Sequence, residues 1–590
     1  MTGSVTGSVT GTAKTREPRR SMGTTWRVGR EPALATIVPG LVFVIAIAVY
    51  TNSLSNGFAV DDGGILLRNA TVHTLDGIWR AFTLPYWPNG AGQYRPLVVA
   101  SFSAEWGVWG GNAAAFHALN VLWHGAASLL VYAFARRWLS FGGSAIAALL
   151  FAVHPVHVEA VSNVVGRAEL MATCGVLGML LLHARRSPWA VVAFAGALLS
   201  KEHAIVAPLL AAGLDLIERR PATQLSVPRE EREPSRRMLP LYAGYGLVAL
   251  VWVAALVVIF HDRRFASVDP FWSSMDAPAR WLTMLGVVPV WLRLWFFPLD
   301  LSADYSPQVT RAWPADLSLA LLGAIMVLVA LVLALALRRR ATPALVAIGW
   351  IGVTMLPVAN ILVPTGVIVA ERTLYLSSVG AVMLAGMGAE WLARRRTGFA
   401  LALVGLLAAA GAARTWTRTK VWESNRSLFL TTAADYPTAS WTHTMLGRIY
   451  VRNGEFSRGV DEYRKALALF DRNSFVWSEA IYAAAQAREM LLADSLVVEA
   501  ERRTQNDYLV TVAHAFVAIE QHRYSESLRV ARRILAVAPD SAAGLWYAGK
   551  AWAALGEVDS ARRALGRIPA GHPLRLIADT LLSALPPPFR

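Results

Sequence analysis

Two adjacent carboxylates, Asp61 and Asp62, stand just past the first apolar segment of the chain. An acidic pair where a membrane segment ends and water begins could act as a general base or bind a metal ion, because the interface sets the pKa and the reach of its carboxylates. The alternative is a solvated turn at Asp62-Gly63-Gly64 with no chemical role. The elements around the pair bear on the choice.

The composition places much of the chain in lipid. Of its 590 residues, 55% are hydrophobic and 16% are charged, and the mean hydropathy is +0.42. The formal charge of +16 comes largely from arginine clusters that follow apolar runs, which is the positive-inside pattern and not a nucleic-acid-binding surface. The 22 Trp suit the aromatic belts of membrane interfaces. A single cysteine, Cys174, excludes an intrachain disulfide.

Apolar runs predict an all-α polytopic membrane domain over 33–413, after a disordered cytoplasmic tail over 1–32. The first run lacks a small-residue cleavage site, which favours a signal anchor. If the ambiguous run 280–297 crossed, the arginines at 338–340 and 394–396 would face outward, so this run is interpreted as re-entrant or interfacial. About eleven crossings are then predicted, at 33–50, 115–135, 141–153, 165–183, 188–200, 203–217, 240–260, 315–337, 342–358, 372–393 and 398–413.

This topology places the N-terminus in the cytoplasm and 51–114, with the acidic pair, in a first external loop. The aromatics of that loop indicate a segment packed on the membrane surface. The segments 154–169 and 201–203 face the same side, and so does the C-terminal part of the chain.

After Arg414 the composition becomes charged and amphipathic, which predicts a soluble domain over 414–590. Gly447, Tyr450 and Gly454 recur as Gly549, Trp552 and Gly556 after 102 residues, three times the 34-residue period of tetratricopeptide repeats (TPRs). The two central units lack the first glycine and are degenerate. We expect an α-solenoid of about four helix pairs whose concave face binds a peptide or a protein.

Seven stretches of the chain carry a common resemblance. They are Asn56-Gly57-Phe58 leading into Asp61-Asp62, Tyr94-Arg95-Pro96-Leu97, the run 117–124, the runs 151–161 and 165–170, Ser200-Lys201-Glu202, Asp304-Tyr305-Ser306, and Glu371-Arg372-Thr373-Leu374-Tyr375-Leu376. Over roughly 34–590 the chain resembles the transmembrane-and-TPR-containing O-mannosyltransferases, in the same domain order. The resemblance implies a GT-C glycosyltransferase fold and inverting transfer of a sugar, expected to be mannose, from a polyprenyl-phosphate donor to Ser or Thr hydroxyls.

Such a reaction needs a carboxylate to take the proton of the acceptor hydroxyl and cations to stabilise the departing phosphate. Asp61 or Asp62 is the candidate base, with Asp61 slightly preferred. The expected phosphate partners stand at predicted external membrane boundaries, and the alternative for each is an ordinary interfacial side chain. They are Arg95, Arg167, Lys201 and Arg372.

Further polar residues are expected to shape the site or accept sugar hydroxyls, namely His154, His157, Glu159, Glu202 and Tyr375. Zinc is disfavoured because the His-Glu-x-x-His signature is absent and Pro155 breaks the local helix. A divalent cation, Mg²⁺ or Mn²⁺, held by Asp61 or Asp62 with Glu159 stays open. Glu202 could instead be a charge partner that makes its neighbour tolerable near lipid.

Three competing functions stay in view. The enzyme could glycosylate a cell-envelope glycolipid, or the chain could be a non-catalytic membrane scaffold whose TPR array docks partners. A transporter is disfavoured because intramembrane charge is sparse and no inverted repeat is visible. Abundant Arg and rare Lys indicate a bacterial inner-membrane protein with a periplasmic or extracellular TPR domain, whereas in a eukaryote the repeats would be lumenal. The expected partners are the lipid-linked sugar, an acceptor protein and membrane lipid, without nucleic acid.

Overall fold

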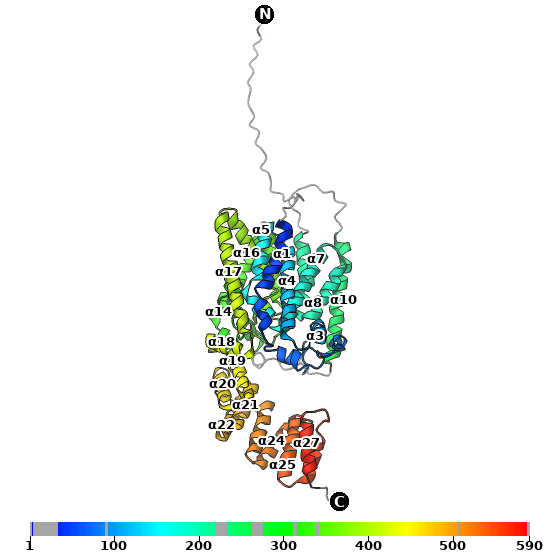
Figure 1. Ribbon diagram of the computed structural model, residues 1–590, viewed down its shortest axis with the longest axis vertical. Coiled ribbons are helices and arrows are strands. Elements are labelled where there is room, and N and C mark those ends of the chain that lie inside the picture. The colour runs from blue at the N-terminus through cyan, green and yellow to red at the C-terminus, as the bar shows by residue number, and fades with distance from the viewer. Residues whose placement is uncertain are drawn as a thin grey trace.

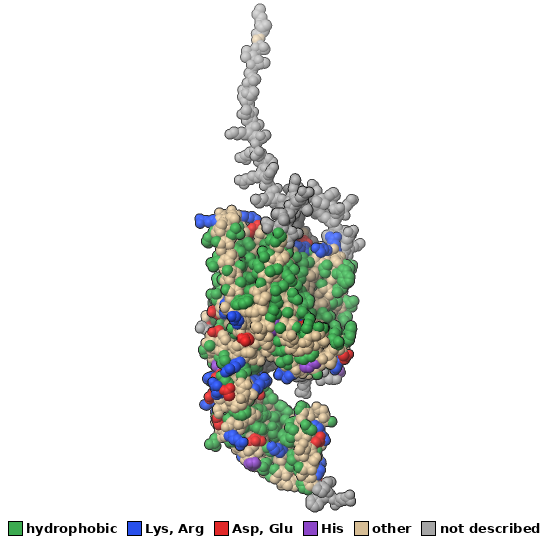
Figure 2. Space-filling model, viewed as in Figure 1, with side chains coloured by type: hydrophobic (Ala, Val, Ile, Leu, Met, Phe, Trp, Pro, Cys, Tyr) green, Lys and Arg blue, Asp and Glu red, His purple; other side chains and the backbone are tan. Residues whose placement is uncertain are grey.

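The computed structural model describes residues 3, 34–88, 92–218, 234–261, 275–310, 316–337, 342–505 and 507–586, and within them every regular element is a helix. The tail predicted over 1–32, apart from Gly3, and the arginines at 219–220 and 338–340 lie outside these residues. A bundle of apolar helices stands over an array of short helix pairs (Figure 1). Figure 2 shows hydrophobic side chains over the flank of the bundle, with charged side chains more frequent toward its ends and over the array.

The bundle and its connections contain seventeen main helical segments before residue 375. They are α1 (Leu34–Ala48), η2 (Gly63–Leu67), α2 (Gly77–Arg80), α3 (Pro96–Trp109), α4 (Ala113–Ala135), α5 (Phe141–Ala152), α6 (Val158–Ser162), η5 (Val164–Gly166), α7 (Arg167–Ala184), α8 (Trp189–Ser200), η6 (Glu202–Val206), α9 (Ala207–Glu218), α10 (Pro234–Phe260), α12 (Ala277–Phe296), α14 (Leu317–Leu337), α15 (Thr342–Met355) and η8 (Glu371–Leu374). Two more helices, α16 (Ser378–Ala393) and α17 (Thr397–Val421), lead to the array.

Six described helices are long and apolar enough to cross a membrane. They are Ile37–Ser55, Ala113–Ala135, Val164–Ala184, Met238–Phe260, Leu317–Leu337 and Thr397–Val421. A seventh results if α5 and the short helices after it, which are bent by 46°, count as one span. The helices α8, α15 and α16 are apolar but shorter. These helices fit a membrane protein, and the eleven crossings stay a prediction.

The ambiguous run 280–297 forms most of α12, a continuous helix that does not double back. Near its start, Trp281 Nε1 donates to Ile361 O at 3.2 Å. Near its end, Trp295 O accepts from His154 Nε2 at 2.9 Å. Both partners belong to connections between bundle helices, and the interfacial or re-entrant placement of this run relative to a membrane stays a prediction.

Small residues let the bundle helices approach closely. A Cβ on Gly386 of α16 would lie 2.4 Å from Gly143 O of α5, and one on Gly380 would lie 2.5 Å from Ala347 O of α15. In lipid the hydrophobic effect does not hold helices together, so such close packing contributes much of the attraction between them. The helix α16 is thereby held between α5 and α15, and this fixes η8 directly before it.

The array consists of α18 (Asn425–Asp435), four antiparallel helix pairs and a final helix. The pairs are α19 (Ser440–Arg452) with α20 (Phe456–Leu469), α21 (Ser474–Gln486) with α22 (Met490–Thr504), α23 (Tyr508–Glu520) with α24 (Tyr524–Val537), and α25 (Ala542–Ala554) with α26 (Val558–Gly566), followed by α27 (Leu574–Ala584). A left-handed residue follows the first helix of each pair: Gly454 (φ +79°), Arg488 (φ +64°), His522 (φ +59°) and Gly556 (φ +83°). These four are spaced by 34 residues, so the period persists through the central units although the sequence there lacks glycine.

Glycine in the first helix of the outer pairs has a packing reason. A Cβ on Gly447 would lie 2.7 Å from the Tyr463 ring, and a Cβ on Gly549 would lie 2.6 Å from Leu565. Each glycine therefore permits close contact with the second helix of its own pair.

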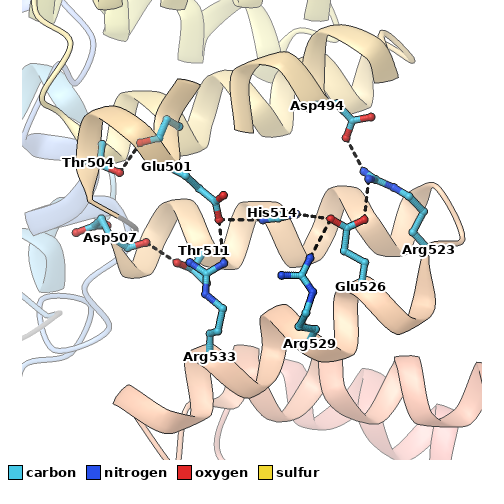
Figure 3. A network of polar contacts seen from close by, with 11 residues as sticks. Asp494, Glu501, Thr504, Asp507, Thr511, His514, Arg523, Glu526, Arg529 and Arg533 are labelled. Atoms are coloured by element: carbon cyan, nitrogen blue, oxygen red, sulfur yellow. Dashed lines mark hydrogen bonds and ion pairs between the residues drawn. The ribbon is translucent and has the colours of Figure 1, made fainter. Parts of the chain in front are cut away.

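A polar network joins three helices of the array (Figure 3). His514 of α23 lies 3.0 Å from Glu501 of α22 on one side and 3.0 Å from Glu526 of α24 on the other. Arg533 of α24 adds a 3.1 Å contact with Glu501, and Arg523 pairs with Glu526 at 2.7 Å. Networks of this kind make neighbouring repeat units depend on one another.

The left-handed turns allow a stability prediction. Arg488 is exposed at φ +64°, where a side chain costs about 1–2 kcal/mol and glycine does not. Arg488→Gly should therefore raise the melting temperature of the array, and Gly454→Ala, at φ +79°, should lower it. Thermal unfolding of the two variants followed by circular dichroism would check this. A lower melting temperature for Arg488→Gly would contradict the turn geometry.

Candidate functional site

The turn that contains Asp61 and Asp62, called the acidic turn, is held by the end of α17 and the start of α18. Asn56 Nδ2 donates to Thr419 O at 3.1 Å, and Val60 N donates to Asn425 Oδ1 at 2.7 Å. Val60 has φ +51°, a strained conformation for a β-branched residue. A strained backbone conformation persists only where surrounding contacts enforce it, and such conformations concentrate at functional sites.

The two carboxylates of the turn have different surroundings, and Asp62 is the fully buried one. Its Oδ2 accepts from Ala59 N at 3.0 Å and Val164 N at 3.3 Å, and its Oδ1 accepts from Val165 N at 2.9 Å. Burial raises the pKa of Asp62 to about 7, although these backbone bonds oppose the shift. A pKa near neutrality suits a base, but both oxygens are engaged and enclosed, so the geometry favours a structural role that joins the first loop to η5.

Asp61 is partly exposed, and its carboxylate makes no hydrogen bond or ion pair with the part of the chain that the structure describes. Burial lowers the pKa of Arg372, but Glu159 and Asp61 together raise it by more. Asp61 and Arg372 therefore share one electrostatic neighbourhood. An accessible carboxylate beside a cation could accept a proton while the cation binds an anion.

All four cations predicted from the sequence lie in ion pairs with carboxylates, and three of them keep part of the side chain exposed, namely Arg372, Lys201 and Arg95. Arg372 Nη1 pairs with Glu159 Oε1, and Glu159 Oε2 also accepts from Arg372 N at 2.9 Å. The Arg372 side chain keeps 25% of its surface exposed, the most of the three. Arg372 is thus the cation best placed to meet a ligand.

The other two pairs are less accessible at the cation. Lys201 Nζ, with a side chain 8% exposed, pairs with the fully buried Glu169. Arg95, 10% exposed, binds Glu202 through two hydrogen bonds of 2.9 and 2.6 Å. Burial raises the pKa of Glu202, but the Arg95 guanidinium outweighs this and holds it at about 2. Glu202 is therefore the charge partner of Arg95 and not of its neighbour Lys201.

These cations act on one another. Burial lowers the pKa of Lys201, and the charges of Arg95 and Arg372 lower it further, against the opposing effect of Glu169. The structure thus brings Arg95, Lys201 and Arg372 into one region with Asp61 at its edge. A phosphate entering this region would compete with Glu202, Glu169 and Glu159 for these cations.

Arg167, the fourth predicted cation, is completely buried. Its Nη1 pairs with Glu105, its Nε donates to Asn120 Oδ1 at 2.8 Å, and its Nη2 donates to Phe116 O at 2.9 Å. These bonds join α3, α4 and α7. With a further bond from Nη1 to Ser101 Oγ, four of its five N–H groups are engaged, and the side chain is enclosed, so the geometry favours a structural role for Arg167 over the predicted binding role.

The predicted site-shaping histidines bind protein groups. His154 Nε2 contacts Trp295 O, and His157 Nε2 lies 2.8 Å from Ser378 Oγ. The Tyr375 hydroxyl lies 2.8 Å from Nδ1 of His124 on α4. All of these side chains are buried, so in this structure they support the site from behind.

The donors proposed for a divalent cation do not form a metal site. Asp62 binds backbone N–H groups with both oxygens, and Glu159 binds Arg372. Across the described segments, no group of three or more His, Cys, Asp or Glu side chains is arranged to hold a metal ion. Asp62 and Glu159 thus do not fit that role here, and a divalent cation held by Asp61 stays a prediction.

A second buried carboxylate connects the site to the array. Glu371, next to Arg372, accepts from Tyr305 Oη at 2.7 Å and Ser302 N at 2.6 Å. Burial raises its pKa to about 7. In the same loop, Asp304 Oδ2 accepts from Thr442 N and Oγ1, at 2.8 and 3.0 Å, on the first helix of the first pair. One loop therefore contacts both the neighbour of Arg372 and the array.

Sequence reasoning missed several of these supports. Glu105 and Asn425 carry no local signal, because their partners Arg167 and Val60 lie about 60 and 365 residues away along the chain. The motif Asp304-Tyr305-Ser306 was singled out without a role, which the loop contacts now supply.

Comparison with known proteins adds a family context. No family model matches the chain. It is 25% identical over 468 residues to the Caenorhabditis elegans protein O-mannosyl-transferase F38B6.6, which covers 75% of this chain and 64% of the relative. It is 26% identical to human protein O-mannosyl-transferase TMTC3, over 66% of this chain and 47% of the relative. Drosophila melanogaster Tmtc2, also a protein O-mannosyl-transferase, is 32% identical over 46% of this chain and 31% of its own length.

Relatives over most of the chain are thus protein O-mannosyl-transferases at about 25% identity. The chain spans less than two thirds of the length of the relatives named above, from 31% to 64%.

Proposed function

We propose that the chain is a membrane protein O-mannosyltransferase of GT-C type that moves mannose from a polyprenyl-phosphate donor to Ser or Thr hydroxyls of a protein. The names of the relatives and the apolar helices support a membrane glycosyltransferase. The observation that carries the assignment of the site is the partly exposed carboxylate of Asp61, without a partner among the described residues, in the electrostatic neighbourhood of Arg372.

In the proposed reaction the acceptor hydroxyl attacks the anomeric carbon of the donor sugar, and its proton passes to Asp61. The bond between that carbon and the phosphate oxygen breaks, and the electron pair leaves with the phosphate. Attack from the side opposite the leaving group inverts the anomeric configuration. Arg372 binds the phosphate first, with Lys201 and Arg95 contributing positive charge from behind it.

The array is proposed to be a TPR domain that recruits the acceptor protein, on the basis of its 34-residue period. The loop 302–306 would then keep the array in register with Arg372, because Asp304 binds the first pair and Ser302 binds Glu371. We propose a bacterial inner membrane because arginine is abundant and lysine rare, and we propose a cytoplasmic N-terminus and an external array from the distribution of arginine.

A comparison of donors tests the proposal. Membranes that contain the chain receive labelled mannose either as polyprenyl-phosphate mannose or as GDP-mannose, with transport between the two pools blocked. We expect protein labelling from the lipid-linked donor and at least tenfold less from the nucleotide sugar. No labelling from either donor, with the array still capturing proteins, would favour the scaffold.

A further inference from the structure

The first loop contains a pocket that the proposed reaction does not use. Its volume is about 330 Å³, and its lining consists of Arg68, Asn69, Ala70, Thr71, Arg80, Ala81, Leu84, Pro85, Pro88 and Val99. Two of the lining residues are exposed arginines, Arg68 and Arg80. Arg68 makes no hydrogen bond or ion pair within the described chain, and Arg80 has only a 3.9 Å contact with the exposed Asp76. Two guanidinium groups are thus available at one cavity.

Large apolar side chains surround this pocket along the chain. Leu67, Leu75, Trp79 and Phe82 expose 44%, 59%, 74% and 37% of their surfaces. Four such residues within sixteen positions are unfavourable in water. Exposed Trp, Phe and Leu next to arginine are typical of a segment that lies in the boundary between headgroups and acyl chains. We refer to these four residues as the apolar collar.

The location of residues 67–82 agrees with a position at the boundary between headgroups and acyl chains. Ser103 Oγ of α3 donates to Thr71 O at 3.4 Å, which holds the segment against α3. In Figure 1, α3 lies at the end of the bundle from which the array extends, beside α8 and α10 at its edge. The collar therefore stands where the apolar flank of the bundle ends, next to any surrounding lipid.

We propose that the pocket binds the phosphate of an anionic phospholipid headgroup, with Arg68 and Arg80 as its ligands and the apolar collar inserted beside the acyl chains. A planar guanidinium donates two hydrogen bonds to phosphate oxygens, and two of them neutralise its charge. The collar distinguishes a membrane lipid from an acidic peptide, because a peptide in water gives Trp79 and Phe82 no apolar partner. This inference rests on the chain lying in a membrane and not on glycosyl transfer.

The pocket adjoins the acidic turn. Arg68 directly follows η2, which begins next to Asp62. A Cβ added to Gly63 or to Gly64 would lie 3.7 Å from the Arg68 guanidinium. A lipid bound to Arg68 would therefore contact the segment that holds Asp61. We therefore expect lipid binding to anchor the first loop to the membrane surface, one helical turn along the chain from Asp61.

Binding of fluorescent phosphatidylglycerol to the purified full chain in detergent tests the proposal. We expect Arg68→Gln/Arg80→Gln to weaken binding by at least tenfold, since each arginine near a lipid surface contributes about 1 kcal/mol. The matched control is Arg464→Gln/Arg563→Gln, two exposed arginines of the array, which should bind as the wild type does. All four arginines are exposed, and melting curves would verify that the variants fold.

A second variant and two competitors identify the ligand. Trp79→Ser/Phe82→Ser should weaken phosphatidylglycerol binding and leave binding of inorganic phosphate unchanged. Inorganic phosphate should displace the lipid only at far higher concentration. Equal lipid affinity in the wild type and the arginine variant would overturn the inference, and so would displacement by inorganic phosphate or by a poly-aspartate peptide at concentrations equal to that of the lipid.

Discussion

Asp61→Asn should lower the rate of sugar transfer by about 10²–10⁴-fold, the contribution of a positioned general base. Asn has nearly the same shape and cannot take the proton of the acceptor hydroxyl. The Asp61 carboxylate makes no hydrogen bond within the described residues, so the variant should unfold at the same temperature as the wild type. Transfer of labelled mannose, measured beside a melting curve at matched protein levels, would check both expectations.

The neighbouring carboxylate provides the control. In Asp62→Asn an amide replaces one carboxylate oxygen and leaves at least one buried N–H of Ala59, Val164 or Val165 without an acceptor. An unsatisfied buried group costs about 1–3 kcal/mol, so this variant should melt at a lower temperature. The two variants should thus separate rate from stability. A reversed result, with Asp61→Asn active and Asp62→Asn stable but inactive, would move the base to Asp62.

Arg167→Met should strongly reduce the amount of folded protein. Removing one partner of a buried ion pair costs about 3–5 kcal/mol, because the other charge stays buried without compensation. Here that charge is Glu105, 3% exposed. The amount of monodisperse protein after detergent extraction would measure the loss.

A double variant distinguishes a structural Arg167 from a phosphate ligand. Arg167→Met/Glu105→Gln removes both charges, and replacing a buried ion pair by neutral groups is often nearly neutral for stability. If Arg167 acts only through folding, the double variant should recover both folded protein and sugar transfer. A folded double variant that transfers no sugar and has lost affinity for the donor would return Arg167 to the phosphate site.

Much of the architecture could be predicted because it depends on periodic patterns. Apolar runs indicated the helices of the bundle, and the glycine pairs 102 residues apart indicated the 34-residue period. The period was harder to see in the central units because Arg488 and His522 occupy the left-handed turns that glycine usually fills. The parity of the arginine clusters argues against a crossing of 280–297, and this stays a prediction, because the contacts of α12 do not locate a membrane.

The site was predictable as a region and less so in its details. Three of the predicted cations do gather near Asp61, since the topology places their segments on one side. Which of two adjacent aspartates is buried depends on Val164 and Val165, about 100 residues away, and no local pattern encodes that contact. The same reason explains Arg167, whose position at a boundary did not reveal that its side chain turns inward to Glu105.

The destination of the sugar tests the central claim most directly. Membranes containing the wild type or Asp61→Asn would receive tritiated polyprenyl-phosphate mannose, and protein and lipid fractions would then be separated and treated with mild alkali and borohydride. The proposal predicts alkali-released mannitol from the protein fraction of the wild type and a loss of at least a hundredfold in the variant. Label that enters a glycolipid and not protein, or equal protein labelling by both chains, would contradict it.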